Sequence, residues 1–287
     1  MSNNTQNLEG RLEHVTSERS NLHLNRRNFI TSLGVAGAAV STLGALGCGD
    51  NGVVPVAVNP NYVPSVVDVL NFALNLEYLE ASFYLYLTTG SGLSTTDMGS
   101  NPGTVTGGAK LTFTSSVIAS AANQLALDER EHVTFLRATI AAVGGTPVSM
   151  PNLNLAAGGA ITSDATFLAA ARQLEGVGVS AYIGGAQYLT SSTPAILYAA
   201  QILDTEAQHA GFLRELCIVN NVVSPAADSQ DQPPTATQVF NTSNTTGLNP
   251  VRTTSQVLQI VYGAPGQTGV TKGGFFPSGL NGNIAIS

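Results

Sequence analysis

The chain has 287 residues, of which 43% are hydrophobic and 10% are charged, and its formal net charge is −7 at pH 7. An acidic chain without a basic stripe cannot neutralise many phosphates, which argues against a nucleic-acid partner. Two cysteines are too few for a disulfide framework or for a metal centre built from four cysteines.

Residues 1–47 have the features of an export signal. Arg26-Arg27 follow a polar leader and precede an uncharged run, residues 29–47, that is rich in Gly, Ala, Ser and Thr. Twin arginines before a mildly apolar stretch predict a signal of the twin-arginine (Tat) pathway, and so a periplasmic or cell-envelope location. The run approaches the length of a membrane span, so a membrane anchor is the alternative. Its many small and hydroxylated residues disfavour that alternative.

The expected cleavage site lies directly before Cys48. Ala45-Leu46-Gly47 fits a signal peptidase site of the A-x-A type. The same residues resemble a lipobox, in which Cys48 would be acylated and the protein anchored to lipid. The sequence leaves a lipoprotein and a soluble periplasmic protein both open.

Four long helices are expected after a Val/Pro/Asn-rich linker at residues 48–62. Apolar residues recur at helical spacing, and Ser, Thr, Asp or Pro stands at each expected start. The sequence predicts an all-α four-helix bundle over residues 63–221. Its helices are expected at residues 64–87, 114–143, 163–189 and 193–220.

The connections and the tail also have expected forms. Residues 88–110 are rich in Gly, Ser and Thr and predict a loop or a short hairpin. Residues 144–162 are long enough to carry the chain back along the bundle as a crossover between helices two and three. The tail, residues 222–287, is rich in Pro, Gly and Asn, with one short apolar element at 255–262. Because the helices carry few charges, we expect some of their faces to be covered, either by this tail or by a second copy in a homo-oligomer.

Two segments of the chain are near copies of each other. Residues 124–137 read QLALDEREHVTFLR and residues 201–214 read QILDTEAQHAGFLR. Each contains Glu-x-x-His, which on a helix places a carboxylate and an imidazole on one face, one turn apart. A single such pair is more often a surface feature, but two in register within a longer repeat indicate a shared role.

Each copy is preceded by a helix with a repeated signature of its own. Glu77 is followed by Ser82 and Tyr84, and Glu175 is followed by Ser180 and Tyr182 at identical spacing. A bundle that binds two metal ions uses one Glu from each of two helices and a Glu-x-x-His from each of the others. The sequence therefore predicts these metal ligands: Glu77, Glu129, His132, Glu175, Glu206 and His209.

Charge balance supports this ligand set. Burying an ionised carboxylate without a partner costs several kcal/mol, and two divalent ions would balance four of them. Glu129 and Glu206 are expected to bridge the ions, and His132 and His209 to cap one ion each. Glu77 and Glu175 are expected as the terminal carboxylates.

Four neighbouring residues need separate interpretation. Glu80 lies one turn after Glu77 and could bind metal in its place, but its counterpart in the repeat is Gly178. Glu131 is expected on a solvated face. Tyr84 and Tyr182 are expected as core residues that hydrogen-bond a carboxylate, and a catalytic redox role is the alternative for both.

The chain resembles the ferritin-like proteins, and within them an exported group related to plant desiccation-associated proteins. The resemblance is carried by NFALNLEYLE at residues 71–80, QLEGVG at 173–178, both Glu-x-x-His segments and Gly-Gly-Phe-Phe-Pro at 273–277. It extends over residues 63–282. It implies a ferritin-like four-helix bundle with two iron ions or two manganese ions as cofactors.

Three functions fit this resemblance. The first is an oxidoreductase that uses oxygen or hydrogen peroxide at a di-iron centre. The second is a manganese catalase, and the third is a non-catalytic stress or desiccation protein that keeps the metal for stability.

Overall fold

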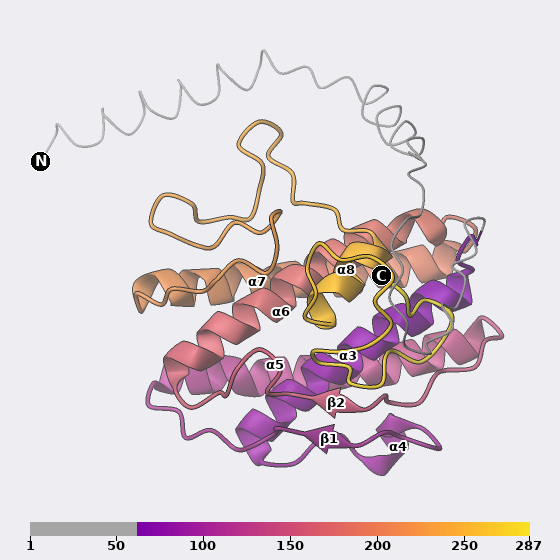
Figure 1. Ribbon diagram of the computed structural model, residues 1–287, viewed down its shortest axis with the longest axis horizontal. Coiled ribbons are helices and arrows are strands. Elements are labelled where there is room, and N and C mark those ends of the chain that lie inside the picture. The colour runs from indigo at the N-terminus through magenta and orange to yellow at the C-terminus, as the bar shows by residue number, and fades with distance from the viewer. Residues whose placement is uncertain (1–61) are drawn as a thin grey trace, which may run out of the picture. The chain divides into compact units, whose positions relative to one another are not determined.

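The computed structural model describes residues 62–287 (Figure 1). The expected Tat signal, with Arg26-Arg27 and Cys48, lies outside the described residues, as does nearly all of the expected linker. Within residues 62–287, no helix combines the length and the apolar character that crossing a membrane requires.

Four long helices make up the bundle, and a serine side chain caps the start of each. Each serine hydroxyl accepts a hydrogen bond from a backbone N–H in the first turn, which satisfies a donor that the helix itself leaves unpaired. The expected all-α fold is confirmed, and the helix ends differ from the expected ones by a few residues. The helices are α3 (Val66–Thr89), α5 (Ser116–Ala142), α6 (Asp164–Gly185) and α7 (Thr193–Val219).

The helices form two pairs, α3 with α5 and α6 with α7. A short 3-10 turn, η1 (Ala186–Tyr188), lies in the brief connection between α6 and α7. The backbone N–H groups of Thr114 and Ser115 donate to the Asp164 carboxylate, so α5 and α6 begin side by side. A helix of 27 residues is roughly 40 Å long. The connection between α5 and α6 therefore runs back along the bundle, as a ferritin-like crossover does.

The connection between α3 and α5 differs from the expected loop or hairpin. It contains a short helix, α4 (Thr95–Met98), and a two-residue strand, β1 (Val105–Thr106). This strand pairs in parallel with β2 (Leu153–Asn154), which lies in the crossover. The prediction of a hairpin was wrong because the pairing partner lies about 50 residues further along the chain, where no local turn signal can indicate it.

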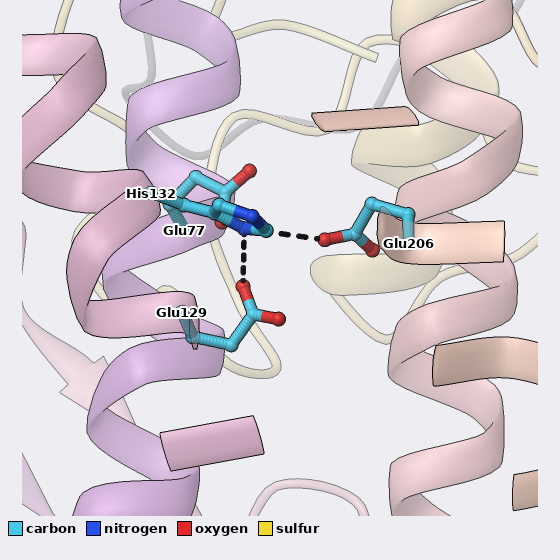
Figure 2. A group of neighbouring side chains, drawn as sticks. All are labelled: Glu77, Glu129, His132 and Glu206. Carbon is cyan, nitrogen blue, oxygen red and sulfur yellow. Dashed lines mark hydrogen bonds and ion pairs between the residues drawn. The ribbon is translucent and has the colours of Figure 1, made fainter. Parts of the chain in front are cut away.

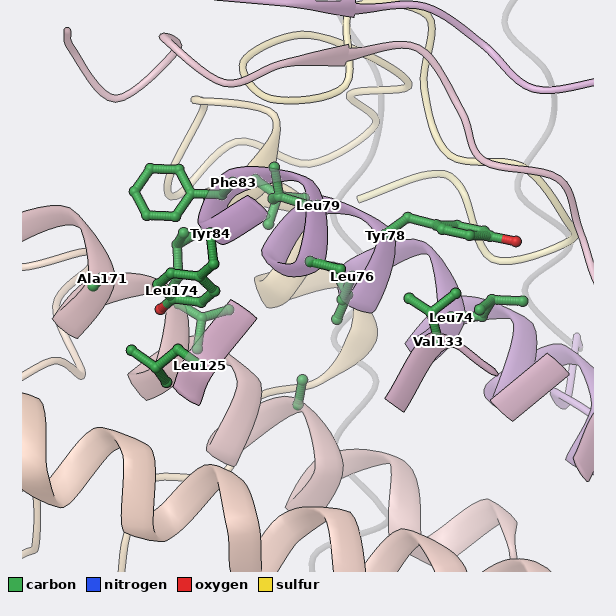
Figure 3. Close-up of a cluster of buried hydrophobic side chains, with 14 of the residues drawn as sticks. Leu74, Leu76, Tyr78, Leu79, Phe83, Tyr84, Leu125, Val133, Ala171 and Leu174 are labelled. Atoms are coloured by element: carbon green, nitrogen blue, oxygen red, sulfur yellow. The ribbon is translucent and has the colours of Figure 1, made fainter. Parts of the chain in front are cut away.

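The core is richest along α3 and α6, which bury most of their residues. Figure 3 shows leucine, tyrosine and phenylalanine side chains of α3 lying among Leu125 and Val133 of α5 and Ala171 and Leu174 of α6. The side chains of Phe83, Tyr84 and Phe167 contact one another through their rings. Burying this apolar surface stabilises the bundle by roughly 25 cal/mol per Å².

The tail packs on the bundle through buried charges as well as apolar contacts. Its helix α8 (Thr254–Val261) lies against α6. Arg252 is 1% exposed, and its guanidinium donates to the Ser180 hydroxyl on α6 and to the Asp228 carboxylate within the tail. A Cβ atom at Gly184 would lie 1.9 Å from the carbonyl oxygen of Arg252. Only glycine allows the tail to approach α6 this closely.

We predict that the ion pair between Arg252 and Asp228 stabilises the docked tail. Burial raises the pKa of Asp228, but the hydrogen bonds and the charge of Arg252 lower it below its ordinary value. Such a carboxylate stabilises the fold above its unfolded pKa of about 3.9 and loses this effect as pH falls through the folded value. Asp228→Asn should lower the free energy of unfolding at pH 7 by about 2 kcal/mol, since it weakens charged hydrogen bonds.

Urea titrations monitored by circular dichroism at pH 7 and at pH 3 measure this effect. The two proteins should differ less at pH 3, because Asp228 of the unfolded wild-type chain is then largely protonated and folding must release that proton. Glu215→Gln, on the exposed side of α7, is the matched control and should change stability little. A loss for Asp228→Asn that is as large at pH 3 as at pH 7 would contradict the ion-pair explanation.

Candidate metal centre

The six predicted ligands lie together inside the bundle. Glu77 comes from α3, Glu175 from α6, and the two Glu-x-x-His pairs from α5 and α7. The four glutamates are at most 1% exposed. Each is held by a different helix at an interior position, so the packing of the bundle brings the carboxylates together.

The first group of ligands contains Glu77, Glu129, His132 and Glu206, and one ligand atom from each lies within 4.8 Å of the others. His132 Nδ1 lies 3.3 Å from Glu77 Oε2, 3.1 Å from Glu129 Oε2 and 3.6 Å from Glu206 Oε1. Figure 2 shows Glu206 extending from α7 toward His132 and Glu129 on α5. The imidazole nitrogen and the carboxylate oxygens therefore converge on a single point.

The second group contains Glu129, Glu175, Glu206 and His209, and it meets the same distance limit. His209 Nδ1 lies 3.1 Å from both Glu129 Oε1 and Glu175 Oε2. Glu129 and Glu206 belong to both groups, and the two imidazole rings are 6.3 Å apart. Two neighbouring positions thus share two carboxylates, which is the arrangement of bridging ligands.

The unpaired oxygens of this cluster fit metal ions. Among the buried side-chain atoms of residues 62–287, Glu77 Oε2, Glu129 Oε1 and both carboxylate oxygens of Glu206 have no hydrogen-bond partner. The imidazoles lie close to three of these oxygens without forming a hydrogen bond to them, and Glu206 Oε2 has no such contact either. Leaving buried carboxylate oxygens unpaired costs several kcal/mol. Carboxylate oxygens and imidazole nitrogens are ligands that iron, manganese and zinc accept. The residues present therefore fit two divalent cations.

The charges of the cluster perturb its titration. Burial alone lowers the pKa of His132, but Glu77 and Glu129 raise it to about 11, and Glu129 and Glu175 likewise raise the pKa of His209 to about 10. Burial and the charge of Glu175 raise the pKa of Glu129 to about 7. In the metal-free cluster the imidazolium protons partly offset the carboxylates. Because metal ligands must be deprotonated, cations compete with these protons.

Two tyrosines form hydrogen bonds to Glu175 and Glu77, the carboxylates expected to be terminal ligands. Each tyrosine bonds to the glutamate on the other helix of the pair α3 and α6. Tyr84 on α3 donates to Glu175 Oε1 on α6 at 2.5 Å, and Tyr182 on α6 donates to Glu77 Oε1 on α3. Burial and the adjacent carboxylates raise the pKa of both hydroxyls well above the ordinary value, so both remain donors. Each tyrosine thus orients the glutamate of the opposite half of the repeat and leaves that carboxylate's other oxygen facing the cluster.

Glu80 lies beside the cluster but belongs to neither ligand group. It is 4% exposed, and burial together with the charges of Glu175, Glu129 and Glu77 raises its pKa well above the ordinary value. Its counterpart, Gly178, leaves space for a ligand, since a Cβ atom there would lie 2.4 Å from Glu206 Oε2. Glu131 is exposed and forms an ion pair with Arg130.

Sequence reasoning did not identify Asp128. Its carboxylate Oδ2 lies 3.2 Å from His209 Nε2, on the side of the imidazole away from the cluster. A carboxylate in this position fixes the orientation of a ligand imidazole. The repeat offers no signal for it, because the residue at the matching position of α7 is Thr205.

A polar pocket of about 510 Å³ lies between α5 and α7 and reaches both imidazoles. Asp128, Glu131, Thr205 and Gln208 contribute to its lining. Small polar molecules and cations can therefore reach the ligand cluster from this side.

The chain belongs to the ferritin-like domain family, whose model matches residues 65–218 and so more than half of the sequence. Among solved structures, the chain is similar to a ferritin-like, diiron-carboxylate protein from Bacillus anthracis str. Ames. The identity is 17% and the TM-score is 0.38, over 53% of this chain and 94% of that chain. A comparison with curated protein sequences gives no match.

We predict that the protein binds two divalent metal ions per chain, because two ligand groups share two carboxylates. Glu206→Ala should lose most of both ions, since Glu206 serves both positions. Glu77→Gln should lose most of one ion. Glu80→Gln should retain both, because Glu80 is in neither group. The measurement is metal content by mass spectrometry after growth with iron or with manganese.

Glu131→Gln is the control, since Glu131 is an exposed glutamate on the same helix as Glu129. It should bind as much metal as the wild type. Equal losses from Glu77→Gln and Glu80→Gln would contradict the assignment of the terminal ligand. A content near zero in the wild type under both metals would contradict the metal site itself.

Proposed function

We propose that the protein is an oxidoreductase that binds two iron ions or two manganese ions and reduces oxygen or hydrogen peroxide. The observation that carries this proposal is the sharing of Glu129 and Glu206 between two adjacent ligand groups. Glu77, Glu129, Glu175, Glu206, His132 and His209 would hold the two ions, which would supply the electrons for reducing oxygen or peroxide. The expected role in oxidative stress is part of the same proposal.

The surrounding residues support chemistry at an enclosed site. Tyr84 and Tyr182 hold Glu175 and Glu77 by hydrogen bonds and are the nearest buried hydroxyl donors to the cluster. Asp128 orients the His209 ring. The polar pocket between α5 and α7 leads from solvent to both imidazoles and is wide enough for hydrogen peroxide. The chain thus combines a buried ligand set with one polar entrance.

We expect the metal-loaded protein to consume hydrogen peroxide when a reductant is supplied, and Glu206→Ala to lose this activity. Tyr84→Phe removes one hydrogen bond to a carboxylate, worth about 1.5–3 kcal/mol. It should lower the rate by roughly tenfold or more while both ions stay bound. Glu215→Gln, at an exposed position of α7 away from the pocket, should behave as the wild type. The assay is peroxide consumption by protein of known metal content.

The same assay separates the alternative functions. Oxygen release from peroxide without any reductant, with manganese bound, would indicate a catalase. No consumption with either metal, together with a higher melting temperature on metal loading, would indicate a structural metal site in a stress or desiccation protein. Either outcome would overturn the proposed reaction while leaving the ligand assignment intact.

We also propose that the protein is exported, as the twin arginines of the leader suggest, and acts in the periplasm or at the cell envelope. Changing Arg26-Arg27 to Lys-Lys should keep the precursor inside the cell, because the pathway depends on the arginine pair. Arg11 and Arg19, changed to Lys in the same leader, are the matched control. Cell fractionation and immunoblotting measure the outcome. Normal export of the Arg26-Arg27 variant would contradict the proposal.

A further inference from the structure

A second cavity, of about 220 Å³, lies on the side of the bundle formed by α3, α6 and the tail. Its walls are mostly apolar and come from α3, α6, the crossover and the tail. Figure 3 shows three of its leucines, at positions 76 and 79 of α3 and 174 of α6. The apolar side chains of the wall include Leu76, Leu79, Leu174, Val177, Val261 and Phe275.

The inner end of this cavity is formed by Glu80 and Gly178. Glu80 is 4% exposed, and its side chain is part of the cavity lining. A Cβ atom at Gly178 would lie 3.5 Å from Glu80 Oε1 and 2.4 Å from Glu206 Oε2. Glu206 is one of the two carboxylates that the ligand groups share. Gly178, which has no side chain, therefore lies between the cavity and the carboxylate of Glu206.

The repeat between α3 and α6 does not extend to Glu80 and Gly178, which occupy matching positions. The helices α3 and α6 match at Glu77 and Glu175 and again at Tyr84 and Tyr182, yet Glu80 is matched by Gly178. A carboxyl buried this deeply is costly to keep unless it has a hydrogen-bond partner. A ligand that hydrogen-bonds to Glu80 would offset this cost.

We propose that this cavity binds a small phenol, with its ring among the leucine, valine and phenylalanine side chains and its hydroxyl group on Glu80. The size fits, since a cavity of about 150 Å³ lined by Leu, Ile and Phe binds benzene. Glu80 at the inner end fits one hydroxyl, because a carboxyl can accept a hydrogen bond from it. The apolar walls exclude strongly charged molecules.

The bound phenol supplies the electrons for the peroxide reduction proposed above, and this assignment rests on that proposed function. Each of two phenol molecules loses one electron and one proton to become a phenoxyl radical, and one hydrogen peroxide is reduced to two waters. The two substrates then enter from different sides: peroxide through the polar pocket between α5 and α7, and phenol through the apolar cavity.

Calorimetry with p-cresol as the probe tests binding without any turnover. Ala170→Leu fills the cavity from α6 and should weaken p-cresol binding to the full-length, metal-loaded protein at least tenfold. Ala165→Leu, at an exposed position of the same helix, should stay within about twofold of the wild type. Melting temperature and metal content identify any variant that has not folded.

A second comparison isolates Glu80 and does not depend on filling the cavity. Glu80→Met keeps a similar shape but removes the polar group. The ratio of affinities for p-cresol and toluene should fall roughly 2- to 10-fold, as expected for one net hydrogen bond of about 0.5–1.5 kcal/mol. An unchanged ratio, or p-cresol binding that Ala170→Leu does not weaken, overturns the assignment of the site.

Peroxide assays then separate the two proposals. If p-cresol binds as expected and supports peroxide consumption in the wild type but not in Ala170→Leu, both proposals are supported. If p-cresol binds as expected but no peroxide is consumed with either metal, the proposed function fails and the phenol site stands. If peroxide is consumed with other reductants and p-cresol does not bind, the phenol site fails alone.

Discussion

The burial of four glutamates at one point of the bundle is the constraint on which the rest of the structure depends. Glu77, Glu129, Glu175 and Glu206 are almost fully inaccessible, and several of their oxygens have no hydrogen-bond partner among the described residues. Two imidazoles cannot balance this charge, whereas two divalent cations can. The tyrosines that hold the outer carboxylates and the glycine that makes room for Glu206 follow from the same requirement.

The internal repeat makes the two ligand groups similar to each other. Where the two halves of the repeat differ in sequence, the surroundings of the cluster differ as well. Toward α5 and α7 the cluster faces a polar pocket, where Asp128 contacts His209 but its counterpart Thr205 cannot act as a carboxylate. Toward α3 and α6 it faces an apolar cavity, where Glu80 has glycine as its counterpart. The duplicated scaffold therefore places two similar ligand groups between two chemically different cavities.

The tail completes this arrangement. The helices α3 and α6 have few charged residues, so an uncovered bundle would expose apolar surface. Arg172, buried on α6, pairs with Asp231 of the tail, and Arg252 of the tail bonds to Ser180 of α6. This ion pair and this charged hydrogen bond fix the tail at defined positions, which apolar packing alone does less precisely. The covered face then encloses the cavity beside the metal centre.

The four helices and the six side chains that cluster in the bundle could be predicted from the sequence, because both depend on local spacing. Serine caps and apolar periodicity locate helices, and residues three apart on a helix share a face whatever surrounds them. The contacts between elements are seen only in the tertiary structure. They include the hydrogen bonds of Tyr84 and Tyr182 to glutamates on the opposite helix and the contact of Asp128 with His209. The pairing of β1 with β2 is of the same kind. Such contacts depend on how each element is rotated about its axis and shifted along it relative to its neighbour. The spacing of residues along one helix does not contain this information.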